Sequence, residues 1–320
     1  MDNAQQSSGA NGGDLRTLLF VLLAVFVSDV LLRSMENMLS GNIAHVNEIT
    51  ELVEDYDSSS DNSLLFLGNS LTNNGVDLPL VNELLPANGI PVGDSTKLVP
   101  DATTIWSWSC VLKNHFFNNE TSPGVVILGF GWDQLSDQSR ILPTRLGAFF
   151  CSAADLPSIN RHRSLSSAET GEFLTAGALR TYAHRETIRN RVLSTVVPHY
   201  QSMTQSINRQ QRDVQSDSNQ QFSYSVLSSL IDSLQTHDSR LIVVAMPVRD
   251  NPYEVDHRLR EFLDDLEIPL FDYTNLGPIN DGSFLDDMHL NPEGARILST
   301  RLAKDLAVTL ALQSDPLSHP

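Results

Sequence analysis

LLFLGNSLT, residues 64–72, is the stretch that decides the fold. Its first four residues form a short apolar run before turn-forming residues, which is typical of a strand buried on both faces of a parallel sheet. Gly68 ends the run and permits a tight turn. Open α/β sheets bind ligands at the carboxyl edge of their strands, so Ser70 is predicted to project its hydroxyl from that edge. Gly-Asn-Ser alone is a weak signal, because Asn69 or Ser70 equally well caps a following helix.

Strand and helix patterns alternate through most of the remaining sequence. They predict helices at residues 76–85, 104–117 and 292–312, and strands at residues 125–128, 240–246 and 268–271. This alternation predicts an α/β fold whose parallel sheet is covered by helices on both faces. The pattern weakens at about residues 138–239, which we interpret as a partly helical insertion with a mobile segment rather than a separate domain.

FLDDMHLNPEG, residues 284–294, is the second stretch with chemical content. Asp286 stands three residues before His289, so its carboxylate can reach the imidazole Nδ1–H and leave Nε2 facing a nucleophile. Asn291 is a good N-cap and Pro292 suits the first helical position, so a helix start fixes where this loop points. A lone Asp-x-x-His is more often structural than catalytic. Because no further ligand residues cluster nearby, we predict neither a metal nor another cofactor.

The two stretches together resemble a known family. Gly68-Asn69-Ser70-Leu71 is similar to the first sequence block of the SGNH (GDSL-type) hydrolase superfamily, and Asp286-x-x-His289-Leu290-Asn291 is similar to the last. The resemblance covers about residues 63–135 and 238–312. It implies a flavodoxin-like three-layer α/β/α sandwich with a parallel sheet. It also implies a serine esterase or acyltransferase that forms an acyl-enzyme, with Ser70 as nucleophile, His289 as base and Asp286 orienting His289.

The sequence departs from the family pattern where an oxyanion would be stabilised. The family's third block contains Gly-x-Asn, whereas this chain has Gly131-Trp132-Asp133-Gln134, with Asp133 at the expected Asn position. An ionised carboxylate repels an oxyanion, a protonated one donates a hydrogen bond to it, and Gln134 offers an amide instead. The candidate oxyanion or substrate residues are Leu71, Asn69, Gly131, Asp133 and Gln134. The departure leaves open a catalytically weak or inactive protein that keeps the fold as a binding or assembly module.

The N-terminal sequence predicts a membrane anchor. LLFVLLAVFV, residues 18–27, has no polar side chain and lies between Arg16 and Arg33. As a helix, the residues between these arginines span ~24 Å, which is shorter than a hydrocarbon core of ~30 Å. Arginine side chains can extend to the interfaces and the bilayer can thin, so an anchor remains feasible. A cleaved signal peptide is the alternative, but no Ala-x-Ala site follows the apolar run.

The predicted organisation begins with a disordered N-terminus (residues 1–15), a transmembrane anchor (16–33) and a stalk with linker (34–62). An SGNH-like domain (63–312) and a disordered tail (313–320) follow. This layout resembles proteins that acylate or deacylate cell-envelope polymers. The resemblance implies a single-pass membrane protein whose catalytic domain is extracytoplasmic and acts on ester-linked acyl groups of an envelope or extracellular glycan. It does not distinguish hydrolysis from acyl transfer.

Composition narrows the choice of partners. The 39 acidic residues outnumber the 21 basic residues and give a net charge of −18, which argues against nucleic acid as a partner. Cys110 and Cys151, the two cysteines, form either one disulfide outside the cytoplasm or two unpaired buried thiols. Trp106, Trp108 and Trp132 either line a sugar-binding cleft or pack helix against sheet.

Overall fold

The computed structural model describes residues 12–39, 41–56, 62–197 and 222–313. Its centre is a five-stranded parallel sheet in the order β2-β1-β3-β4-β5, which is the flavodoxin-like order. The strands are β1 (Leu64–Leu67), β2 (Ser95–Leu98), β3 (Val125–Phe130), β4 (Arg240–Ala245) and β5 (Leu270–Asp272). The prediction of a parallel α/β sheet is confirmed. β2 escaped prediction because it is an edge strand in which only Leu98 is fully buried.

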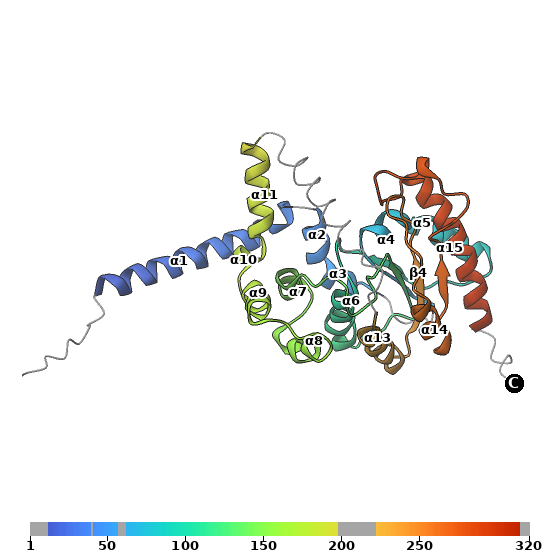
Figure 1. Cartoon of the computed structure of the whole chain (residues 1–320), viewed down its shortest axis with the longest axis horizontal. Helices are drawn as coiled ribbons and strands as arrows, with labels where there is room; N and C mark the ends of the chain where they lie inside the picture. The colour runs from blue at the N-terminus through green and yellow to red at the C-terminus, as the bar shows by residue number, and fades with distance from the viewer. Residues whose placement is uncertain (1–11, 40, 57–61, 198–221, 314–320) are drawn as a thin grey trace, which may run out of the picture.

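Helices cover both faces of the sheet and make three layers (Figure 1). One face packs against α5 (Leu78–Ala87) and α15 (Pro292–Gln313). The opposite face packs against α3 (Ile49–Glu54), α6 (Ile105–Val111), α13 (Ser225–Thr236) and α14 (His257–Asp265). Successive strand residues point to opposite faces, so Leu64 and Phe66 join the first layer while Leu65 and Leu67 join the second.

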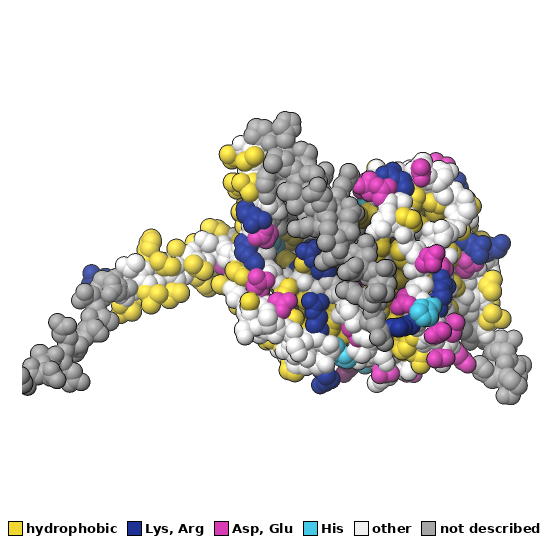
Figure 2. All heavy atoms as spheres, viewed as in Figure 1, with side chains coloured by type: hydrophobic (Ala, Val, Ile, Leu, Met, Phe, Trp, Pro, Cys, Tyr) yellow, Lys and Arg dark blue, Asp and Glu magenta, His cyan; other side chains and the backbone are white. Residues whose placement is uncertain are grey.

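The N-terminal helix α1 (Gly12–Met35) extends away from the sheet, with its apolar side chains exposed (Figures 1 and 2). Among the described residues, one helical stretch, Leu15–Met38, is long and apolar enough to cross a membrane. A signal sequence meets the same criterion, so the structure leaves both alternatives in place.

The segment predicted as a stalk packs against the domain instead of standing apart from it. It forms η1 (Glu36–Met38), α2 (Gly41–Asn47) and α3, and the apolar side chains of α2 and α3 join the core beside α6. Val46, Ile49 and Val53 recur at helical spacing and are buried. The stalk interpretation therefore needs correction over residues 41–56. The predicted linker residues 57–61 lie outside the described part of the chain.

The segment predicted as an insertion, about residues 138–239, divides in two: α13 belongs to the layer that covers the sheet, and the preceding helices lie beside α6. They are α7 (Pro143–Phe149), η4 (Ala153–Asp155), α8 (Leu156–His162), α9 (Ser167–Ala178), α10 (Arg180–Ala183) and α11 (Arg185–Val196). A disulfide between Cys110 and Cys151 joins the insertion to α6 and excludes the alternative of two free thiols. The segment predicted to be mobile, residues 201–221, and most of the two termini predicted to be disordered lie outside the described residues.

Polar contacts hold the last turns of α1 against the insertion. The Asp29 carboxylate accepts hydrogen bonds from the Thr181 amide at 2.9 Å and from Arg33 Nε at 2.9 Å. Arg33 also donates to the carbonyl of Ala178 at 3.1 Å. One turn further on, Glu36 contacts His184 Nε2 at 3.0 Å, and that imidazole is buried. The apolar helix therefore leaves the domain at a fixed place and not through a free tether.

Asp137 joins the loop after β3 to the first turn of α13. Its buried carboxylate accepts hydrogen bonds from the amides of Ser225 and Val226, both at 2.9 Å, and from the hydroxyls of Ser223 and Ser225. Burial alone would favour the neutral acid, but these hydrogen bonds lower the pKa of Asp137 below its ordinary value. The ionised form therefore stabilises the fold.

We predict that Asp137→Asn lowers the free energy of unfolding by roughly 2–3 kcal/mol at neutral pH, because buried donors lose a charged acceptor. The pKa is lower in the folded than in the unfolded state, so the stabilisation is complete above the ordinary value of 3.8 and declines as the pH falls below it. Thermal unfolding at several pH values measures both effects. Asp232→Asn, which changes an exposed residue of α13, is the matched control. Equal effects of the two substitutions would contradict the prediction.

Candidate active site

Ser70 lies where β1 passes into the short helix α4 (Ser70–Gly75). Asn69 is extended and caps this helix, since its Oδ1 accepts a hydrogen bond from the amide of Leu71 at 3.0 Å. Ser70 is half-buried at the carboxyl edge of the sheet. Asn69 therefore does cap a helix, and the cap fixes the position of the serine that follows it.

Close approach explains why glycine stands at two positions around this turn. A Cβ atom added at Gly68 would lie 2.1 Å from Thr72 Oγ1, and one added at Gly129 would lie 2.2 Å from the same atom. Gly68 does not have a positive φ, so unusual backbone angles are not the reason for it. The two glycines let the first turn of α4 pack directly against β1 and β3.

His289 lies on a closed loop immediately before α15. Phe284 and Leu290 form an antiparallel bridge, and the Leu285 amide donates to the His289 carbonyl at 2.8 Å. Asn291 Oδ1 caps α15 by accepting from the amides of the second and third helical residues, each at 3.0 Å. The predicted cap and Pro292 at the start of the helix are both present. Packing of α15 against the sheet thus fixes the direction of the loop.

The three predicted residues form one hydrogen-bonded row. Ser70 Oγ lies 2.9 Å from His289 Nε2, and His289 Nδ1 lies 2.8 Å from Asp286 Oδ2. Asp286 Oδ1 also accepts from the amides of Met288 and His289. Partial burial opposes ionisation of Asp286, but the hydrogen bonds from His289 and these amides hold its pKa below the ordinary value. An ionised carboxylate, an imidazole and a hydroxyl in this order suit proton transfer from the serine.

The proposed oxyanion donors are largely engaged with each other. The Leu71 amide is bonded to Asn69 Oδ1, and the Gly131 amide donates to Gln134 Oε1 at 2.9 Å. Asn69 Nδ2 donates to Gln134 Oε1 at 2.8 Å and to the Thr103 carbonyl at 3.2 Å. Within the described residues, Gln134 Nε2 has no hydrogen-bond partner. Of the five candidates, the side-chain amide of Gln134 is therefore the donor that remains available.

Asp133 lies in a strained loop. Trp132, which precedes it, has a φ of 50°, a left-handed conformation that is rare for a bulky residue. The Trp132 indole donates to the Asn251 carbonyl at 3.0 Å and its ring lies against Tyr253, which together hold this conformation. Asp133 as a whole is exposed, yet the surrounding protein desolvates its carboxyl and raises the pKa above the ordinary value.

Two further residues bond to the backbone just before Asn69 and Ser70. Thr103 Oγ1 and Trp108 Nε1 each lie 2.9 Å from the Gly68 carbonyl. Trp106 and Trp108 are buried, so they pack in the core and do not line a sugar-binding cleft; Trp132 is half-buried. A buried indole N–H usually has a hydrogen-bond acceptor, and the Gly68 carbonyl fills this role for Trp108, which indicates that Trp108 is structural.

A cavity of about 300 Å³ lies beside the loop that carries His289. It is lined by residues from the ends of β4 and β5 and from the start of the histidine loop: Pro247, Val248, Arg249, Thr274, Asn275, Leu276, Gly277, Ile279, Asn280, Asp281 and Phe284. Arg249 pairs with Asp250 at 3.0 Å and with Asp287 at 2.9 Å, so its charge is already compensated. The lining of the cavity is therefore polar but carries no excess positive charge from Arg249. In the described part of the chain, no group of His, Cys, Asp and Glu is arranged to hold a metal.

No family model matches the sequence, and no curated protein matches it. Solved structures of similar shape include a GDSL-like lipase from Bacteroides thetaiotaomicron, with 9% identity, a TM-score of 0.41 and coverage of 83% of this chain and 98% of that chain. A lipase/acylhydrolase from Enterococcus faecalis has 12% identity, a TM-score of 0.40 and coverage of 77% and 96%. An acetyl xylan esterase, AlAXEase, has 15% identity, a TM-score of 0.37 and coverage of 76% and 98%. Such low scores describe a loose likeness of shape, so the chain's own residues must carry the functional argument.

We predict that Gly129→Ala destabilises the protein by roughly 1–3 kcal/mol, because the added methyl group collides with Thr72 under Ser70. Gly171→Ala is the matched control, since it lies in α9 with no atom near the added Cβ, and we expect it to stabilise by roughly 0.4–1 kcal/mol. Thermal unfolding of both variants checks the signs. A destabilised Gly171→Ala or an unaffected Gly129→Ala would contradict this account of the packing.

Proposed function

We propose that this protein is a serine esterase or acyltransferase of the SGNH type, with Ser70 as nucleophile, His289 as general base and Asp286 as the residue that orients His289. The observation that carries the proposal is the 2.9 Å separation of Ser70 Oγ and His289 Nε2. This separation lies within the range of roughly 2.6–3.2 Å that proton transfer requires. The flavodoxin-like strand order and the position of Ser70 at the carboxyl edge of β1 support it.

The reaction follows from the order of the three groups. Ser70 Oγ attacks the carbonyl carbon of an ester while His289 Nε2 takes the hydroxyl proton. The imidazolium, stabilised by the Asp286 carboxylate, returns this proton to the leaving alcohol, and the acyl group stays on Ser70. Water then releases a carboxylic acid, or a sugar hydroxyl takes the acyl group; His289 accepts the proton of the attacking hydroxyl and returns it to Ser70 Oγ as the acyl–serine bond breaks. The first outcome is hydrolysis and the second is acyl transfer.

The oxyanion in this proposal is stabilised by Gln134 rather than by the family's Asn. Its Nε2 group is the unengaged amide of the loop after β3, whereas its Oε1 already accepts from Asn69 and Gly131. Desolvation raises the pKa of Asp133 above its ordinary value, so its carboxyl group is harder to ionise than one in water. Loss of one oxyanion donor typically costs ~100–1,000-fold in turnover, so slow catalysis is consistent with this site.

A second candidate function is binding without efficient catalysis. The amides of Leu71 and Gly131 are both occupied by side chains of the site itself, which favours a protein that keeps the fold as a binding or assembly module. The two candidates differ in whether Ser70 reacts.

The proposed location is a membrane, with α1 as a single-pass anchor and the catalytic domain on the extracytoplasmic side. The exposed apolar surface of α1 supports the anchor. The Cys110–Cys151 disulfide supports the extracytoplasmic side, because such bonds persist in oxidising compartments. The proposed substrate is an ester-linked acyl group of an envelope or extracellular glycan. The cavity of about 300 Å³ beside the histidine loop is large enough for a small organic group.

We predict that a fluorophosphonate probe labels the full-length protein stoichiometrically and that Ser70→Ala abolishes the labelling. Ser229→Ala, on the exposed face of α13, should label like the wild type. Intact-protein mass spectrometry measures the adduct. A folded wild-type protein that neither labels nor turns over p-nitrophenyl acetate would exclude the enzyme and favour the binding module.

Asp286→Asn tests the role of the carboxylate separately. The amide retains the shape but not the charge that stabilises the imidazolium, so we expect p-nitrophenyl acetate turnover to fall by ~100–10,000-fold with the serine still present. Asp287→Asn, its neighbour in the same loop, removes one negative charge without touching His289 and should retain at least about a third of the activity. If both variants lost activity equally, general destabilisation of the loop would replace the proposed role.

A further inference from the structure

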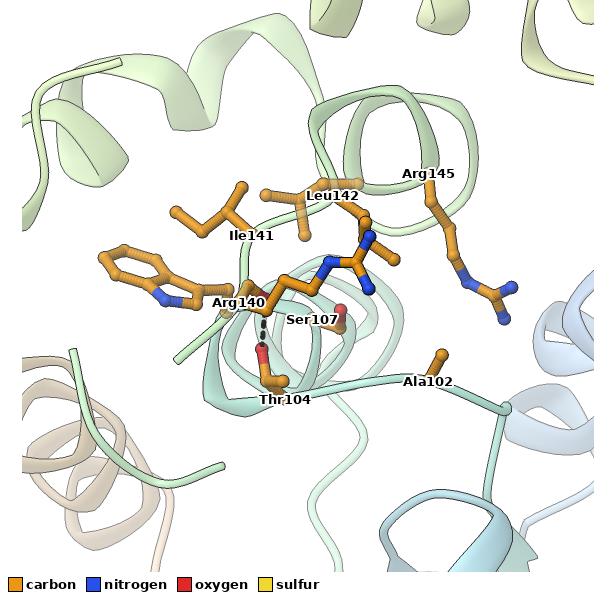
Figure 3. Close-up of a pocket in the computed structure, with 9 residues that line it drawn as sticks. Ala102, Thr104, Ser107, Arg140, Ile141, Leu142 and Arg145 are labelled. Atoms are coloured by element: carbon orange, nitrogen blue, oxygen red, sulfur yellow. Dashed lines mark hydrogen bonds between the residues drawn. The ribbon is translucent and has the colours of Figure 1, made fainter. Parts of the chain in front are cut away.

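A small hollow lies between the start of α6, the loop before α7 and α7 itself (Figure 3). Its volume of about 10 Å³ matches a single water molecule or oxygen atom, not a sugar ring. The residues that line it are Ala102, Thr104, Trp106, Ser107, Arg140, Ile141, Leu142, Arg145 and Leu146. In Figure 3, Arg145 extends from α7 towards the loop that carries Ala102, and Arg140 lies across the start of α6 with its guanidinium on the side of Arg145.

Hydrogen-bond donors line this hollow, and no carboxylate of the described residues lies within ion-pair distance of its two arginines. Arg145 Nε and Nη2 are buried without a hydrogen-bond partner, and the indole N–H of Trp106 is buried without one as well. Within the described ranges, neither Arg140 nor Arg145 forms an ion pair, although the Phe150 ring lies 5.9 Å from the Arg145 guanidinium. Arg145 is half-buried, and its two buried N–H donors without acceptors would gain from an anionic oxygen placed beside them.

Two other arginines of these helices have a carboxylate within ion-pair distance, although Arg180 Nε, like Arg145 Nε, is buried without a hydrogen bond. Arg180 lies 3.5 Å from the Glu36 carboxylate, and Arg185 lies 3.7 Å from that of Glu172. Arg145 shares the same group of helices but keeps its charge uncompensated while burial lowers its pKa. The nearby Asp101 favours the charged form without coming within ion-pair distance in the described structure.

The hollow adjoins the candidate active site through one loop. Thr104 lines the hollow, and its neighbour Thr103 accepts a hydrogen bond from Asn69 Nδ2 through its carbonyl. The amide of Ile105, the residue after Thr104, donates to the Gln134 carbonyl at 3.0 Å. The hollow and the candidate active site are thus connected through the backbone of residues 103–105.

We propose that Arg140 and Arg145 form a subsite for an anionic oxygen of the substrate, so that the acylated chain carries carboxylate or phosphate groups. This inference rests on the proposed function for its substrate, but the binding of the anion does not require catalysis. The size of the hollow admits one oxygen between the buried donors of Arg145, and the exposed Arg140 side chain covers the remainder of the group. Guanidinium groups suit both anions, because each offers several donors to two or more oxygens.

Binding of unacylated oligosaccharides to the full-length protein tests the subsite without any reaction. Isothermal titration compares an oligoglucuronate, an oligomeric glycerol phosphate and a neutral xylo-oligosaccharide. We expect the wild type to prefer at least one anionic ligand over the neutral one and Arg145→Gln to weaken that binding by ~10–100-fold. The anion that responds identifies its source, carboxylate or phosphate. Arg161→Gln, an exposed arginine of α8, should bind like the wild type.

Arg140→Gln keeps the test decisive if Arg145→Gln fails to fold, because Arg140 is exposed. We expect it to lower kcat/KM for acetylated oligoglucuronate or acetylated glycerol phosphate oligomer about tenfold more than kcat/KM for p-nitrophenyl acetate, which has no anionic group to contact the subsite. Equal binding of anionic and neutral ligands, or anion binding that survives both substitutions, would overturn the subsite. Lack of fluorophosphonate labelling with intact, arginine-dependent anion binding would overturn the enzyme and leave the subsite standing.

Discussion

The hydrogen bond between Ser70 and His289 connects residues 219 positions apart in the sequence, and the geometry of the site depends on both of its ends. Asn69 fixes the serine by capping α4, and Asn291 fixes the histidine loop by capping α15. Both helices pack on the sheet through the same apolar layer, which also contains Leu71, Leu290 and Leu298. The hydroxyl and the imidazole are thus positioned by one shared core and not by their mutual contact alone.

The parts of the fold that the sequence predicts are those with a strong local signal. β1, β3 and β4 are apolar runs because both of their faces are buried. β2 has no such run, since it lies at the edge of the sheet and is half-exposed. The segment before β1 has the spacing of a helix, but this spacing does not show which surface the helix covers, so the sequence suggests a stalk. Only the position of α6 reveals that Ile49 and Val53 complete the core.

The site likewise has one part that the sequence predicts and one part that it does not. The row of Ser70, His289 and Asp286 follows from two short motifs whose residue types and spacing restrict the chemistry. The oxyanion side was less predictable, because the direction in which an amide side chain points depends on neighbours from other loops. Gln134 turns its oxygen towards Asn69 and Gly131, and Asn69 in turn needs the Thr103 carbonyl. None of these pairings leaves a periodic signal in the sequence.

The polar contacts between the end of α1 and the helices after α6 have a mechanical consequence. Asp29 and Glu36 contact residues of the insertion at Thr181 and His184, so the helix and the domain move as one piece over this region. In the proposed topology, these contacts set the height and tilt of Ser70 above the lipid surface. A polymer must then thread past the serine at that height, and the length of chain between the lipid and the acylated sugar becomes part of the specificity.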